Sequence, residues 1–240
     1  MGLSDSLAQS LLYATLAGAA IPLGAFIAKI EHIRPNWLEK EFRHSVIAFG
    51  GGVLVSAISF VLVPEGAQDV PAGWAVFAFL FGGLCFYVLD RIIEQNKGPY
   101  SQLIAMLTDF IPEALAMGAM LATGNNASIL LVLLIASQNL PEGFNAYREI
   151  MDSGHHKART VLIWFCLMVL FGPLAAFVGG EYLSNQTFAL GFIMLFSAGG
   201  ILYLVFQDIA PQAHLKKRWL PPLGAVFGYS LGLVGHLFLH

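Results

Sequence analysis

Charged residues are scarce in this sequence. Only 11% of its 240 residues are Asp, Glu, Lys or Arg, whereas about 25% is usual for a soluble domain. The net charge is −3 and the densest basic run is Lys216, Lys217 and Arg218, so the chain offers no basic surface for nucleic acid, and no such partner is expected. The two cysteines, Cys85 and Cys166, both lie in apolar stretches, which excludes a disulfide framework.

Hydrophobic residues, in contrast, make up 57% of the chain. One crossing of a bilayer core of about 30 Å takes about 20 apolar residues. The apolar runs therefore predict an all-α integral membrane protein, a single domain over residues 1–240 with eight transmembrane helices. The predicted spans lie near residues 7–28, 44–63, 72–93, 101–123, 127–149, 159–180, 187–210 and 219–239.

The basic residues indicate how these spans are oriented. All 12 lie in or beside alternate connections, namely those between spans 1 and 2, 3 and 4, 5 and 6, and 7 and 8. Basic residues concentrate on the cytoplasmic side of membrane proteins. The sequence therefore predicts that both termini lie outside the cytoplasm. The expected location of the protein is the cell membrane, that is, a plasma or inner membrane.

A weak internal repeat relates the two ends of the chain. The segment Pro22-Leu-Gly-Ala-Phe-Ile resembles Pro173-Leu-Ala-Ala-Phe-Val, and Gly51-Gly52-Val-Leu resembles Gly199-Gly200-Ile-Leu. Segments five spans apart face opposite ways, so the pattern favours an inverted repeat of spans 1–3 and 6–8 around the central spans 4 and 5, as in transporters. Chance matches in a Gly- and Ala-rich sequence are the alternative.

Spans 4 and 5 carry polar side chains on one helix face each. Asp109 and Glu113 are four residues apart in span 4, and Gln138 and Glu142 have the same spacing in span 5. No Lys or Arg lies in the middle of a predicted span to neutralise these acids, and ionisable groups in hydrocarbon are costly when they are unpaired. A cation or protons must therefore supply the missing positive charge.

A proline precedes each of the two glutamates. Pro112 and Pro141 cannot donate to the carbonyl four residues earlier. We therefore expect spans 4 and 5 to be broken helices whose freed carbonyls add oxygens to a cation site near the middle of the membrane.

The segment Gln138-Asn139-Leu140-Pro141-Glu142-Gly143 resembles the span 5 motif of the ZIP (Zrt/Irt-like protein) family of divalent metal transporters. Asp109-Phe-Ile-Pro-Glu113-Ala is similar to the family's span 4 motif, His-Asn-x-Pro-Glu-Gly. The resemblance implies transport of a divalent metal such as zinc, manganese or iron towards the cytoplasm, without an organic cofactor. The metal ligands that it implies are Asp109, Glu113, Gln138, Asn139 and Glu142.

The chain departs from the family pattern at three positions. Asp109 and Phe110 replace the His and Asn of span 4, and Gly172 stands where two-metal members have a Glu before Pro173. The existence of a second metal site is therefore left undecided. Carboxylate and amide oxygens suit manganese or iron, whereas imidazole suits zinc, so selectivity is expected to have moved away from zinc.

Two other functions stay open. A metal sensor or scaffold of the same fold that does not transport would explain the lost His and Asn. An intramembrane enzyme is less favoured, because the sequence has no Gly-x-Gly-Asp or His-Glu-x-x-His motif. We therefore predict that the chain is not an enzyme. Its expected partners are the metal ion and membrane lipid, and a homodimer is left open.

Several residues outside the two motifs are candidates for the cation pathway, each with a simpler alternative. Met117 more often packs in a core, adjacent loop histidines are usually solvated, and an acid at a helix end often faces water. Glu65 and Glu181, at outer helix ends, are expected to mark the membrane interface. The pathway candidates are Met117, His155, His156, Asp208 and His214.

Overall fold

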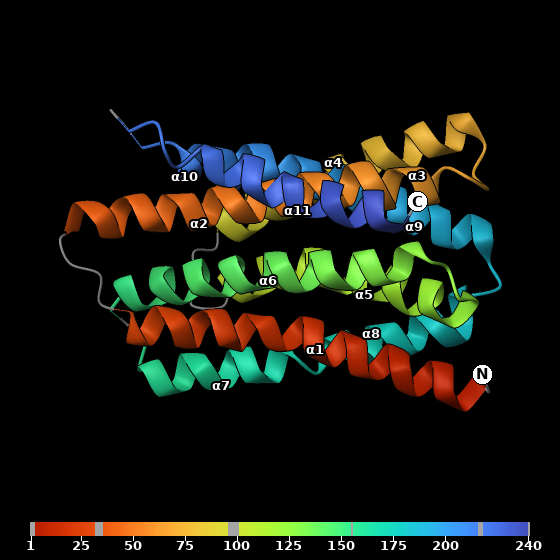
Figure 1. The fold of residues 1–240 in the computed structure, drawn as a ribbon, viewed down its shortest axis with the longest axis horizontal. Coiled ribbons are helices and arrows are strands. Elements are labelled where there is room, and N and C mark those ends of the chain that lie inside the picture. Colours follow the sequence, from red (N-terminus) through yellow and green to blue (C-terminus); the bar gives the residue numbers. More distant parts are fainter. Residues whose placement is uncertain (1–2, 32–35, 96–100, 155, 216–217, 240) are drawn as a thin grey trace.

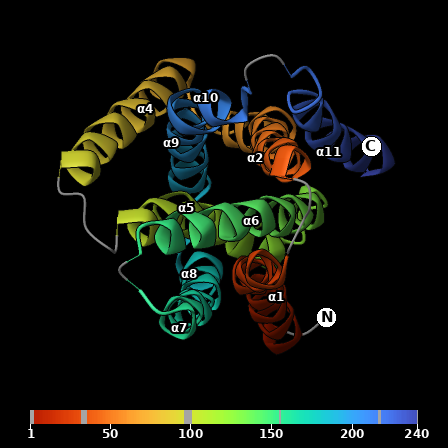
Figure 2. The same ribbon diagram turned by 90° about the vertical axis from the view of Figure 1, so that its left-hand side faces the viewer.

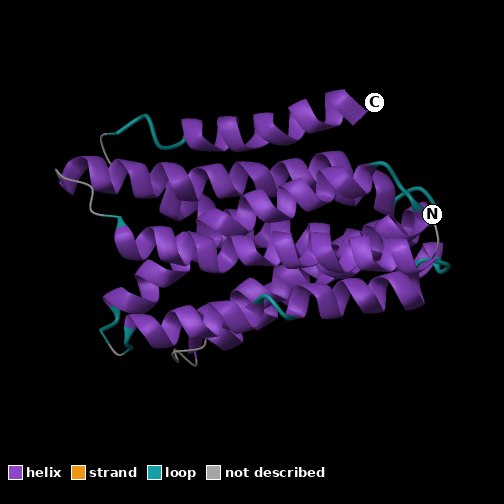
Figure 3. Ribbon diagram, turned by 60° about the horizontal axis from the view of Figure 1, so that its bottom comes forward, coloured by secondary structure: helices purple, strands orange, loops and turns teal. Residues whose placement is uncertain are grey.

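The computed structural model describes residues 3–31, 36–95, 101–154, 156–215 and 218–239. Long helices run nearly parallel to one axis (Figures 1 and 3). The helices are α1 (Leu3–Ile30), α2 (Asn36–Ala57), α3 (Val63–Gly66), α4 (Ala72–Gln95), α5 (Ser101–Thr123), α6 (Ala127–Asp152), α7 (Ala158–Met168), α8 (Phe171–Val178), α9 (Thr187–Leu204), α10 (Ala210–Ala213) and α11 (Leu223–Leu239), with π-helical segments η1 (Ile58–Leu62), η2 (Gly179–Leu183) and η3 (Val205–Ile209).

Among the described residues, seven helical stretches are long and apolar enough to cross a membrane. They confirm an all-α membrane protein. The eighth predicted span forms a shorter apolar helix, Leu223–Phe238, so eight crossings stay a prediction. The seven stretches are Leu7–Ile30, Lys40–Gly66, Ala72–Gln95, Leu103–Thr123, Ala127–Asp152, Ala158–Leu183 and Thr187–Ala213.

The central helices are not broken, and this part of the prediction is wrong. Both α5 and α6 continue through their internal prolines, Pro112 and Pro141. A proline removes one backbone hydrogen bond, and packing on several sides keeps such a helix continuous. The predicted span 6 is interrupted instead, between α7 and α8, just before Gly172 and Pro173.

Two helix groups face each other across a boundary (Figures 1 and 2). The lower group contains α1, α5, α6, α7 and α8, and the upper group contains α2, α3, α4, α9, α10 and α11. Across the boundary, α2 packs on α6 and α5 packs on α9. Both chain ends and the turn between α5 and α6 lie at one end of the molecule, whereas α10 and the start of α2 lie at the other (Figure 1).

The upper group repeats one local structure. The segments η1 and α3 have the same lengths as η3 and α10 and lie 147 residues before them. Close approaches recur at the same interval, because a Cβ on Gly52 would overlap a backbone carbonyl of α11 and a Cβ on Gly199 would overlap one of α4. The inverted repeat stays a prediction, and these offsets support it.

Candidate functional site

The polar faces of α5 and α6 meet inside the lower group. The Gln138 Nε2 donates a hydrogen bond to Glu113 Oε2 at 2.5 Å, and these two side chains are 1% and 0% exposed. The structure thus brings together one predicted residue from each central helix.

The other oxygens of this pair have no hydrogen-bond partner. Glu113 Oε1 and Gln138 Oε1 are both buried and unpaired in the described part of the chain. A buried unpaired acceptor costs free energy, and a buried carboxylate costs more. Since both oxygens are acceptors when Glu113 is ionised, a cation or a hydrogen-bond donor is needed to satisfy them.

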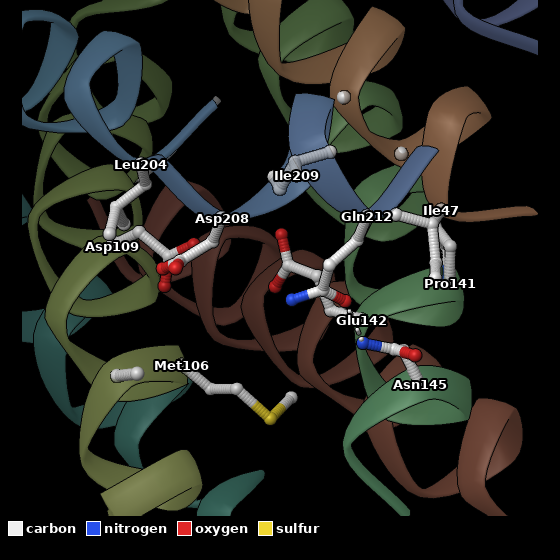
Figure 4. Close-up of a pocket in the computed structure, with 13 residues that line it drawn as sticks. Ile47, Met106, Asp109, Pro141, Glu142, Asn145, Leu204, Asp208, Ile209 and Gln212 are labelled. Carbon is white, nitrogen blue, oxygen red and sulfur yellow. Dashed lines mark hydrogen bonds between the residues drawn. The ribbon is translucent and has the colours of Figure 1, made fainter. Parts of the chain in front are cut away.

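A cavity of about 100 Å³ adjoins the two helices. The lower group lines it with Asp109 from α5 and Glu142 from α6, and the upper group with Asp208 from η3 and Gln212 from α10. In Figure 4, Asp109 and Asp208 stand on one side of this cavity, and Glu142 and Gln212 are further across it. The cavity therefore lies on the boundary between the helix groups, towards the end of the molecule that carries α10.

Like charge accumulates around this cavity. Asp109 is 5% exposed and Glu142 is half-buried, and the charges of Asp109 and Glu113 both act on Glu142. None of the ion pairs in the described part of the chain involves these three carboxylates. Such repulsion between acids favours the binding of a cation.

The acids do not form a closed metal cage. No three His, Cys, Asp or Glu side chains among the described residues are grouped so that they could hold a metal ion. Asp109 Oδ1 accepts a hydrogen bond from the backbone N–H of Phe110 at 2.9 Å. A cation in this conformation would therefore need amide oxygens or water to complete its shell.

Asn139 makes a packing contact that its sequence motif does not indicate. Its Nδ2 donates to the backbone carbonyl of Ala17 in α1 at 2.9 Å, and the side chain is 1% exposed. The bond fixes α6 against α1 inside the lower group. A role of Asn139 as a metal ligand stays a prediction.

The pathway candidates have different surroundings. Met117 is fully buried in the hydrophobic core, as its simpler interpretation predicts, and Asp208 lines the cavity. His214 is exposed beyond the end of α10, and His156 packs edge to face on Trp164 at 5.0 Å between ring centroids. His155 lies outside the described residues.

Arg43, Asn145 and Gln212 belong to the site region, although the sequence did not single them out. Asn145 Oδ1 accepts hydrogen bonds from Arg43 Nε and Nη2, each at 3.3 Å. Its Nδ2 donates to Gln212 Oε1 at 3.2 Å and to Glu149 Oε1 at 3.0 Å. The signal for Asn145 was present, because it follows Glu142 by three residues and so shares its helix face.

Comparison with known proteins gives an informative relative. No family model matches the chain. A protein of Arabidopsis thaliana named "Putative zinc transporter" is 26% identical over 220 residues, covering 84% of this chain. The chain spans about a third of that relative's length, 34%. The relative supports the resemblance to the ZIP family of metal transporters, and its name agrees with a transporter rather than an enzyme.

Proposed function

We propose that the chain carries divalent metal ions across a membrane, towards the cytoplasm, through the site of Asp109, Glu113, Gln138 and Glu142. The observation that carries this proposal is the buried pair of Glu113 and Gln138, whose remaining oxygens lack partners beside a cavity lined by acids. A positively charged ligand would satisfy these acceptors and compensate the negative charge of the acids.

The ligand set also favours certain metals. The metal ligands in this set are carboxylate and amide oxygens, which suit Mn²⁺ and Fe²⁺. Such oxygens bind Zn²⁺ less selectively than imidazole or thiolate does. The plant relative is named for zinc. We therefore propose a broad divalent site that accepts Zn²⁺ together with Mn²⁺ or Fe²⁺.

The direction of transport is inferred from the ends of the molecule. The start of α2, with Lys40 and Arg43, lies at the same end as α10 and the cavity (Figure 1). Basic residues favour the cytoplasmic side. In this orientation both termini lie outside, and the cavity lies on the side where a metal ion would be released.

Uptake into proteoliposomes tests this function. A panel of Zn²⁺, Mn²⁺, Fe²⁺, Mg²⁺ and Ca²⁺ should show uptake of at least one transition metal by the wild type. Glu113→Gln and Glu142→Gln should abolish it, because each removes a carboxylate charge from the site. Glu181→Gln, which changes an exposed acid in η2, is the matched control and should retain uptake. Full uptake by both site variants would show that metal passes elsewhere.

A sensor or scaffold that binds metal without moving it is the second candidate. Asp109 and Phe110, which replace the His and Asn of the family's span 4 motif, favour it. Metal binding by the purified protein together with no flux for any metal of the panel would establish this alternative.

A further inference from the structure

Side-chain hydrogen bonds tie the two helix groups together at both ends of the molecule. At the end with the α5–α6 turn, Asn125 Nδ2 donates to Glu65 Oε2 of α3 at 2.6 Å. At the opposite end, Asn145 Nδ2 of α6 donates to Gln212 Oε1 of α10 at 3.2 Å. Figure 1 shows α3 and α10 at opposite ends of the upper group.

The two acceptors occupy equivalent positions. Glu65 and Gln212 each follow a proline, Pro64 or Pro211, and each proline follows a π-helical segment of five residues. All of these features are offset by 147 residues. One local structure, used twice, thus places a side-chain oxygen against an asparagine of the lower group at each end.

The contact at the α10 end lies beside the metal path. Asn145 and Gln212 both line the cavity that also contains Asp109 and Glu142. A cation that leaves these carboxylates towards this end would therefore pass close to the contact between Asn145 and Gln212. Arg43 reinforces the contact, since it donates to Asn145 and lies 3.6 Å from Asp152.

We propose that the Glu65–Asn125 and Gln212–Asn145 contacts are an outer and an inner gate, which open in alternation during transport. This inference rests on the proposed function. A side-chain hydrogen bond near water contributes little net free energy, so it can break and re-form within a transport cycle. Asn125 is held ready for its contact, because its Oδ1 accepts from the backbone N–H of Ala127 at 2.8 Å.

Reversible cross-linking tests the gates. In a background with Cys85→Ser and Cys166→Ser, one variant carries Glu65→Cys with Asn125→Cys, and another carries Asn145→Cys with Gln212→Cys. A short bifunctional thiol reagent then cross-links the two cysteines and so joins the two helix groups at one end of the molecule. A reductant cleaves this cross-link. Uptake of Mn²⁺, which binds thiolate weakly, should fall at least tenfold after cross-linking and recover after reduction.

Cross-links within one helix group are the matched controls. Asn125→Cys with Ser128→Cys joins two positions already linked by a backbone hydrogen bond of 3.1 Å. Asn145→Cys with Glu149→Cys joins neighbouring turns of α6. These cross-links should leave the uptake of each variant unchanged, because they do not cross the boundary.

A second measurement needs no transport. Ala105 lines the cavity, so Ala105→Cys in the same background reports access to it for an impermeant thiol reagent. Adding Gln212→Leu should speed labelling from the α10 end at least threefold, whereas Glu65→Leu should not. Labelling that Gln212→Leu leaves unchanged, or undiminished uptake in both cross-linked gate variants, would overturn the gates. If neither the wild type nor the uncross-linked variants take up metal, the proposed function is contradicted instead. The labelling rate of Ala105→Cys alone then tests the inner gate.

Discussion

Replacing Gln138 by leucine isolates the contact on which the proposed site depends. The change deletes the hydrogen bond from Gln138 Nε2 to Glu113 Oε2, 2.5 Å long between side chains that are 1% and 0% exposed, and it removes one oxygen ligand at similar side-chain volume. The lost contact between Gln138 Oε1 and the metal ion is comparable to a hydrogen bond to a charged group, which contributes about 1.5–3 kcal/mol. At about 1.4 kcal/mol per factor of ten, metal binding should weaken by about 10- to 100-fold.

The concentration dependence of uptake measures this effect. In proteoliposomes, the KM of Gln138→Leu for Mn²⁺ should rise by about that factor. Ser137→Ala is the neighbouring control, because the Ser137 hydroxyl bonds only the Leu133 carbonyl of its own helix among the described residues, at 2.6 Å. A thermal melting curve of the purified variant separates weaker binding from misfolding. A folded Gln138→Leu protein with the wild-type KM would refute the role of the Glu113–Gln138 pair in metal binding.

Three further outcomes are expected. Glu113→Ala should abolish metal uptake while Met117→Leu, a change of similar volume in the core, should keep it, and radioisotope flux measures both. Asp109→His should shift the preference from Mn²⁺ towards Zn²⁺, because imidazole binds zinc better; an unchanged ratio in a competition assay would remove Asp109 from the ligands. Gly24→Ala should prevent a stable fold, since its Cβ would overlap a backbone carbonyl of α6, whereas Gly73→Ala, which has open space around its Cβ, should melt within a few degrees of the wild type.

The helices and the polar faces of the central pair were predictable because both depend on short-range patterns. Runs of apolar residues marked the helices, and the four-residue spacing of Asp109 with Glu113 and of Gln138 with Glu142 placed each pair on one face. The meeting of Glu113 with Gln138 then required only that α5 and α6 pack as neighbours.

The contacts between distant segments were not predictable in this way. Arg43 and Asn145 are 102 residues apart, and Asn139 and Ala17 are 122 apart. No local spacing indicates such pairs without an alignment of related sequences. The continuity of α6 through Pro141 was mispredicted for a related reason, because packing against α1 and α2 stabilises the helix and that packing is not visible in a local pattern.

The packing of glycines differs between the interior of each helix group and the boundary. In the lower group, a Cβ on Gly24 or Gly143 would overlap a backbone carbonyl of the partner helix, and in the upper group the same is true of Gly52 and Gly199. Such backbone contacts cannot adjust, so these helix pairs within each group are held rigidly together.

Across the boundary, the neighbours of glycine are side chains. A Cβ on Gly50 would lie 3.0 Å from Pro141 Cγ, and one on Gly235 would lie 2.5 Å from Leu130 Cδ1. Side-chain ends can shift, so this boundary can slide more easily than the interior of either group. Glu113, Gln138 and Glu142 all belong to the lower group, whereas both gate acceptors, Glu65 and Gln212, belong to the upper one. In the proposed mechanism, a relative movement of the groups therefore changes which end is closed while the metal keeps its ligands.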